Sequence, residues 1–208
     1  MLVLDPVLKT RTTAGFAAWP VAEVGDDEIL VLSGRMTPLE VGTAMAVIFR
    51  YNDIPAAPVA DLPEPLDRHL AEIGPLVAPG GLRLRDTAAG TEITPACCCG
   101  LESWREWGGL LRGEPVWLGH DPGTEMVHTP LRIRLTQQAA DARRPTRRNK
   151  IEIPRDDLPD LLASAHLSLR EFLRLVRRWA DRTVPHAADR LVAVLDDCFE
   201  ITGPLDLG

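Results

Sequence analysis

The chain has 208 residues and a formal net charge of −7, and 45% of its residues are hydrophobic and 25% charged. These are ordinary values for a globular protein, and they exclude a chain that is disordered along its whole length. At this length folding buries roughly 70% of the surface of the unfolded chain, so no disulfide or structural metal is needed for stability.

The N-terminal residues do not resemble a targeting signal. Residues 1–6 contain neither the basic region nor the start of the long apolar stretch that a signal peptide has. The longest nearly apolar run, Val41 to Phe49, is far shorter than the roughly 20 residues that cross a membrane. Three of the four cysteines are adjacent, which is poor geometry for a secreted disulfide framework. We therefore expect a soluble cytoplasmic protein without membrane contact.

The first third of the chain predicts one strand and two helices. Little periodicity is visible as far as Val24, and no regular element is expected there. Residues 29–32 are predicted to form a buried strand. The segment 37–40 matches a capping box with proline at the first helical position, so a helix should run from there to about Tyr51. A second, short helix is predicted at 65–73.

The middle of the chain has the alternation that is typical of a sheet. Residues 82–85 alternate between apolar and charged side chains, and residues 91–94 follow after a short loop, so a hairpin is expected. A helix is predicted from about Leu101 to Leu111. Three further strands are predicted, at 116–118, 131–135 and 150–153.

The last part of the chain is predicted to be helical, with a short helix at 156–165. A second helix should begin at a capping box at Ser168 and end near Arg182, and Pro185 should open a last one. Strands grouped between helices favour an α+β fold with a mainly antiparallel sheet of about four to six strands in the middle of the chain, flanked by N-terminal helices and a C-terminal helical segment.

This pattern predicts one domain over residues 1–208. Within it we expect an N-terminal helical and irregular part at 1–75, a sheet-rich part at 82–153 and the C-terminal helices at 155–200.

A run of three cysteines, Cys97-Cys98-Cys99, lies between a predicted strand and a predicted helix. Free cysteine packs as a small apolar side chain, so the first interpretation is that the run is buried and structural. The second is a metal site, with Cys97 and Cys99 joined by His120 or His128. Zinc sites usually show paired C-x₂₋₄-C or H-x₃₋₅-H ligands, which are missing here, and we predict no cofactor.

The third interpretation is a reactive thiol. A helix N-terminus favours the thiolate, and Cys98 and Cys99 are nearest to the predicted helix. His120 would act as the base and Asp121 would orient it. Titration of the thiols distinguishes the three interpretations.

Charge is distributed unevenly along the chain. Residues 131–182 hold 13 Arg and Lys and 7 Asp and Glu, a balance of +6, and the remaining residues carry −13. The most basic segment, 143–150, is expected to be the loop of a hairpin. Its candidate partner-binding residues are Arg143, Arg144, Arg147 and Arg148. Because no aromatic residue is interleaved and the chain is acidic, the pattern of this segment favours a surface loop over a nucleic-acid contact. The partner that we expect for the chain is another protein, because its charge is so unevenly divided.

Sequence motifs of the common nucleotide-binding, hydrolase and zinc-protease classes do not occur. The leading hypothesis is therefore a non-enzymatic protein-interaction module, such as an immunity-like protein or a regulatory adaptor. The alternative is a cysteine-dependent enzyme or a thiol or metal site built on Cys97–Cys99 with His120. A third hypothesis is nucleic-acid contact through residues 143–150.

Overall fold

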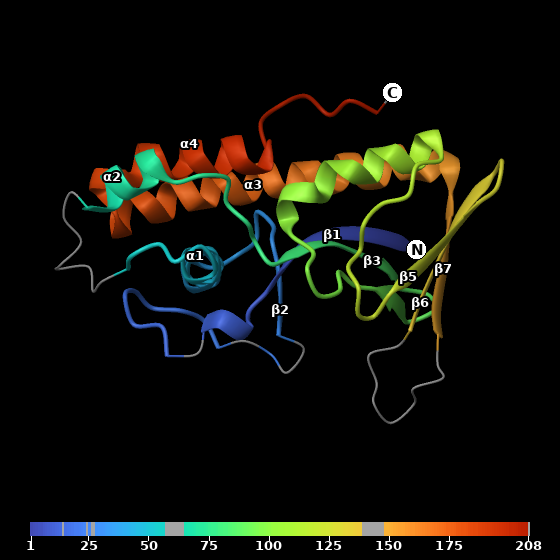
Figure 1. The fold of residues 1–208 in the computed structure, drawn as a ribbon, viewed down its shortest axis with the longest axis horizontal. Helices are drawn as coiled ribbons and strands as arrows, with labels where there is room; N and C mark the ends of the chain where they lie inside the picture. The colour runs from blue at the N-terminus through green and yellow to red at the C-terminus, as the bar shows by residue number, and fades with distance from the viewer. Residues whose placement is uncertain (14, 24, 26–27, 57–64, 139–147, 208) are drawn as a thin grey trace.

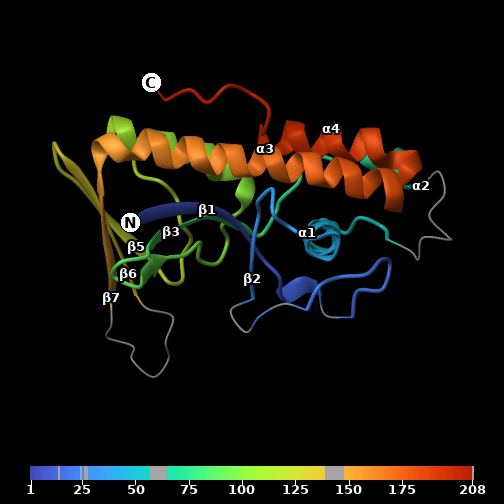
Figure 2. The ribbon, with the colours of Figure 1, turned by 180° about the vertical axis from the view of Figure 1, so that it is seen from behind.

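The structure is a computed structural model that describes residues 1–13, 15–23, 25, 28–56, 65–138 and 148–207. In this part of the chain two antiparallel sheets are combined with a layer of helices (Figures 1 and 2). The α+β prediction is confirmed. The strands, however, number seven in two sheets within the described residues, where a single sheet of about four to six was predicted.

The first sheet has the strand order β2-β1-β3-β4. Its central strand, β1 (Leu2–Lys9), lies in the stretch where no regular element was predicted. This strand is hydrogen-bonded on both edges and is buried at four of its eight positions, so its sequence lacks the alternation of a half-exposed strand. The other members are β2 (Ile29–Val31), β3 (Gly80–Asp86) and β4 (Thr91–Ile93), and the predicted β3–β4 hairpin is confirmed.

The second sheet has the order β5-β6-β7 and contains β5 (Thr124–His128), β6 (Arg132–Gln138) and β7 (Arg148–Pro154). The predicted apolar faces meet, because Leu135 pairs with Ile151. Strand β5 was not predicted. The strand predicted at 116–118 was wrong, since these residues have no regular structure and bury Val116 and Leu118 within a connection.

Helix α1 (Pro38–Tyr51) begins with the predicted capping box, in which Thr37 and Glu40 exchange hydrogen bonds, and it is buried from Val41 to Phe49. The short helix α2 is also confirmed, at Pro65–Glu72. The helix predicted near residues 101–111 is a 3₁₀ helix, η3 (Leu101–Arg112). A 3₁₀ turn that was not predicted, η1, spans Arg11–Thr13.

Helix α3 (Leu158–Thr183) is one continuous helix of 26 residues, where two helices had been predicted. The capping-box pattern at Ser168 therefore lies inside the helix. The buried positions continue across this point, from Ala165 to Leu169, and their packing keeps the helix intact. The turn η4 (Arg155–Asp157) precedes α3, and the C-terminal helices η5 (Pro185–Ala187) and α4 (Ala188–Phe199) follow it.

Helix α3 runs along the length of the molecule, with η3 beside one half of it and α4 beside the other (Figures 1 and 2). It packs on β1, while α1 lies crosswise beneath its C-terminal half. Trp19 packs edge-on against Trp179 of α3, with ring centroids 5.0 Å apart. Buried apolar side chains from both sheets and from the helices form one contiguous core. Among the described residues no helix combines the length and the apolar character that a membrane crossing requires.

Candidate functional site

The three cysteines lie in the connection from β4 to η3, and backbone hydrogen bonds fix this connection on two sides. On one side the N–H of Ala96 donates to the carbonyl of Leu118 over 2.9 Å, and the N–H of Cys97 donates to that of Asp121 over 3.1 Å. On the other side the N–H of Gly80 donates to the carbonyl of Cys99 over 3.1 Å. The cysteine loop is therefore held between the start of β3 and the segment 117–121.

Gly119 makes the close approach of the two segments possible. Its φ of +92° belongs to the left-handed region, and a Cβ at this position would lie 2.2 Å from the carbonyl oxygen of Cys97. A side chain would have to push the segments apart. Glycine at 119 thus lets the next residue, His120, lie against the cysteine loop.

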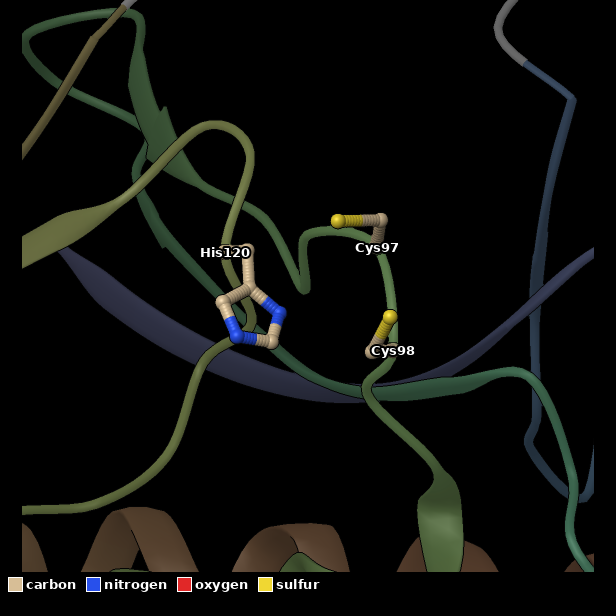
Figure 3. Close-up of side chains that lie close together, drawn as sticks. All are labelled: Cys97, Cys98 and His120. Atoms are coloured by element: carbon tan, nitrogen blue, oxygen red, sulfur yellow. The ribbon is translucent and has the colours of Figure 1, made fainter.

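The structure brings together Cys97, Cys98 and His120. Their two Sγ atoms and one imidazole nitrogen all lie within 4.8 Å of one another. Successive side chains of an extended chain point to opposite sides, but Cys98 has a φ of +60°, and this turn leaves both thiols on the side of His120 (Figure 3). The result is a cluster of two thiols and one imidazole, called here the thiol–imidazole cluster.

The cluster is open to solvent. Cys97, Cys98 and His120 are all exposed, and Cys99 is half-buried. The interpretation of the run as buried packing is therefore wrong for Cys97 and Cys98. The tryptophans of η3, Trp104 and Trp107, are in contrast buried in the core.

The three thiols differ in acidity. Hydrogen bonds from the backbone N–H groups of Asp121 and His120 hold the pKa of Cys97 below its usual value, and the Asp121 nitrogen lies 3.3 Å from Sγ. Hydrogen bonding to Cys97 and its negative charge raise the pKa of Cys98, and burial raises that of Cys99. Cys97 is therefore the first thiol to ionise, whereas Cys98 or Cys99 had been predicted to be the reactive one.

Lys9, at the end of β1, places a positive charge near the three cysteines. Its positive charge acts on Cys98 and Cys99 and offsets part of the rise in their pKa, but the pKa of both thiols stays above its usual value. Partial burial lowers the pKa of Lys9 itself, and the nearby thiolates oppose this shift.

A catalytic arrangement of nucleophile, base and orienting acid is not assembled. The ring of His120 packs edge-on against Trp117, with centroids 4.6 Å apart. Within the described part of the chain, the ring makes no hydrogen bond to a cysteine sulfur or to the Asp121 carboxylate. Asp121 contributes through its backbone, and its side chain does not orient the histidine.

The remaining predicted site residues lie elsewhere. The thiol of Cys99 is not part of the cluster and donates to the carbonyl of Trp117 over 3.8 Å. His128 lies on β5 and is not part of the cluster; its Nδ1 is buried and has no hydrogen-bond partner among the described residues. Arg148 forms an ion pair with Glu125 over 3.1 Å. The other three predicted partner-binding residues, Arg143, Arg144 and Arg147, lie outside the described residues.

Sequence reasoning missed Lys9, Trp117 and Gly119 as parts of the site. A glycine directly before the His-Asp-Pro-Gly turn was a usable signal, because it allows close backbone approach. No spacing links Lys9 to residue 97, since only the pairing of β1 in the sheet brings them together.

Comparisons with known proteins found no relative whose site could be set beside this one. No protein-family model, no curated protein and no solved structure matches the chain. The feature that indicates a function is therefore the thiol–imidazole cluster itself.

Proposed function

We propose that this protein binds a thiophilic metal ion, Zn²⁺ in the first instance, through Cys97, Cys98 and His120. The supporting observation is the convergence of three suitable ligand atoms within 4.8 Å. Zinc binds thiolate sulfur at about 2.3 Å and imidazole nitrogen at about 2.0–2.1 Å, so the ligands of one tetrahedral ion lie about 3.5–3.8 Å apart. A contraction of about 1 Å at exposed side chains is enough to close the site.

The ligand types select the ion. Two thiolates and one imidazole suit Zn²⁺ and Cu⁺, whereas Mg²⁺ and Ca²⁺ require oxygen ligands. The lowered pKa of Cys97 favours the thiolate that a metal needs, and the positive charge of Lys9 offsets part of the rise in the pKa of Cys98.

Three ligands leave one position of a tetrahedral ion free. Structural zinc sites are closed by four protein ligands, and sites that react or exchange keep an open position. The cluster is exposed, and the core of the fold is built without it. An ion at this site would therefore be exchangeable, as expected for a protein that acquires an ion and passes it on.

This role agrees with the non-enzymatic protein predicted from the sequence. It also includes the predicted protein partner, because a ligand atom of a second protein would occupy the open position when the ion is transferred. The proposal requires Cys97 and Cys98 to be reduced, a condition that the cytoplasmic location expected from the sequence would provide.

The test is titration of the purified, reduced protein with Co²⁺ and then Zn²⁺. We expect the absorption bands of thiolate-bound tetrahedral Co²⁺, displacement by Zn²⁺ and one ion per chain. The Cys97→Ser, Cys98→Ser and His120→Ala variants should each weaken Zn²⁺ binding by more than about 100-fold, beyond the effect of losing an outer-shell contact.

The matched control is Cys99→Ser, which removes the adjacent thiol that is not part of the cluster. It should bind Zn²⁺ within about twofold of the unchanged protein. The proposal is wrong if Zn²⁺ does not bind, or if Cys99→Ser weakens binding as much as Cys97→Ser does.

A further inference from the structure

A second surface feature is a hollow of about 350 Å³ where α1 crosses α3. Its lining is mainly apolar and includes Trp19, Met36 and the half-exposed Leu39 on one side, and Leu175 and Trp179 of α3 on the other. None of the described residues that line it is acidic. A volume of this size is at the lower end of the range of ligand pockets and is suited to one large apolar group.

Two arginines of α3, Arg178 and Arg182, also line the hollow, and they continue a longer row. The row consists of Arg170, Arg174, Arg178 and Arg182, four exposed residues at i, i+4 spacing. Successive members are about 6 Å apart along the helix and the whole row spans about 18 Å. None of the four forms an ion pair with any residue that the structure describes.

A neighbouring arginine of the same helix, Arg177, differs from this row because it forms ion pairs with described residues. Arg177 lies off the row and forms ion pairs with Asp189 over 2.6 Å and with Asp181 over 3.7 Å. The helix dipole favours a cation in the last helical turn, which accounts for Arg182 but not for Arg170 or Arg174. The chain as a whole has a net charge of −7, so a basic row without ion pairs stands out from the rest of the surface. Together with the apolar hollow beside it, this row is complementary to a ligand that is acidic and carries an apolar group.

We propose that this surface binds an acidic segment of a partner protein, which inserts one large apolar side chain into the hollow and lays its carboxylates along the arginine row. Such a segment would use both parts of the surface at once. An apolar anchor in a pocket supplies most of the affinity of small interfaces, and complementary charge supplies specificity and a fast encounter. Arginine suits this role because its guanidinium binds carboxylates with two parallel hydrogen bonds.

Other ligands fit less of the surface. A small anionic molecule confined to the hollow would leave Arg170 and Arg174 unused. Single-stranded nucleic acid needs aromatic faces for base stacking, but Trp19 and Trp179 are only 4% and 7% exposed. The surface shares no residue with the thiol–imidazole cluster, so this inference stands apart from the metal proposal.

The test measures the binding of a fluorescein-labelled glutamate-rich peptide with one central leucine, by fluorescence anisotropy at low salt. We expect saturable binding that weakens as salt is added. Arg178→Gln/Arg182→Gln should weaken it at least about tenfold. The matched control, Arg68→Gln/Arg132→Gln, removes the same charge from exposed arginines outside α3 and should change binding less than about twofold.

The apolar anchor is tested by Leu39→Gln and by a peptide in which glutamine replaces the leucine. Each change should weaken binding about tenfold, and the two together should weaken it little more than either alone, because both remove one contact. Circular dichroism establishes that each variant keeps its fold. The inference is overturned if the peptide does not bind, if the control variant loses as much affinity as the α3 variant, or if a labelled single-stranded oligonucleotide displaces the peptide at lower concentration.

Discussion

The backbone N–H of Asp121 donates a hydrogen bond to the Sγ atom of Cys97, with 3.3 Å between the two atoms, although the residues are 24 positions apart. This contact stabilises the thiolate and lowers the pKa of Cys97. It also places His120, the residue before Asp121, beside two thiols. The acidity of Cys97 and the position of His120 therefore both depend on the contact between the β4–η3 connection and the segment 117–121.

The order in which the cysteines react follows from their surroundings. Because only the thiolate is nucleophilic, iodoacetamide at neutral pH should modify Cys97 first and the half-buried Cys99 most slowly. Mass spectrometry of the digested protein at successive times measures the order. Cys198, half-buried beside the backbone of Leu76, is an internal slow control. Faster labelling of Cys99 than of Cys97 would contradict the assigned hydrogen bonding.

Gly119→Ala should both destabilise the fold and abolish metal binding. The substitution combines a left-handed φ with a Cβ that would lie 2.2 Å from the carbonyl of Cys97, so the segment carrying His120 must move away. We expect a loss of about 2–3 kcal/mol of unfolding free energy.

The matched control for this substitution is Gly113→Ala, which has a φ of +83° but no atom within 4 Å of the added Cβ. It should lose about 1–2 kcal/mol and keep its affinity for Zn²⁺. Urea denaturation and metal titration of both variants give the two readouts. Equal Zn²⁺ affinity in the two would show that the approach at Gly119 does not hold the site together.

Metal binding should strengthen as the pH rises. Zn²⁺ must displace the protons of both thiols, and the pKa of Cys98 is raised by Cys97, so Cys98 still holds its proton at neutral pH. Each thiol that is protonated in the free protein contributes up to about a tenfold change in affinity per pH unit.

Competition with a chromophoric chelator, corrected for the chelator's own protonation, measures this dependence between about pH 6 and pH 8. The Cys98→Ser variant should lose most of the slope together with most of the affinity. An affinity that does not change with pH in the unchanged protein would contradict the raised pKa of Cys98.

Two buried tryptophans of η3 should differ in their contribution to stability. Trp104 donates a hydrogen bond of 2.7 Å from its indole nitrogen to the carbonyl of Phe199, and thus ties η3 to the end of α4. Trp104→Phe removes this donor and leaves a buried carbonyl without it, so it should destabilise the fold by about 1–2 kcal/mol more than Trp107→Phe. Trp107 is equally buried and provides the comparison for lost volume. Equal unfolding free energies of the two variants would contradict this role of Trp104.

Local signals were sufficient for much of the secondary structure. The capping box at Thr37 predicted the start of α1, and the alternation of Ile133 and Leu135 predicted a strand with one buried face. These features depend on the backbone preferences and hydrogen bonds of residues close together in the chain, which a single sequence displays.

Features that depend on distant partners were not visible. Strand β1 is central because β2 and β3 pair with its two edges, and burial on both sides erased its alternation. The break predicted before Ser168 does not occur, because packing of α3 against the core outweighs a local capping pattern.

For the site, the sequence by itself determined which residues were available: adjacent cysteines, a histidine that follows a glycine, and arginines at helical spacing. Only the tertiary structure decided that Cys97 and Cys98, rather than Cys99, face His120, and that the arginine row borders an apolar hollow. The physical reason is that residue type sets what a group can do, whereas its neighbours, acidity and exposure are set by segments that meet only when the chain has folded.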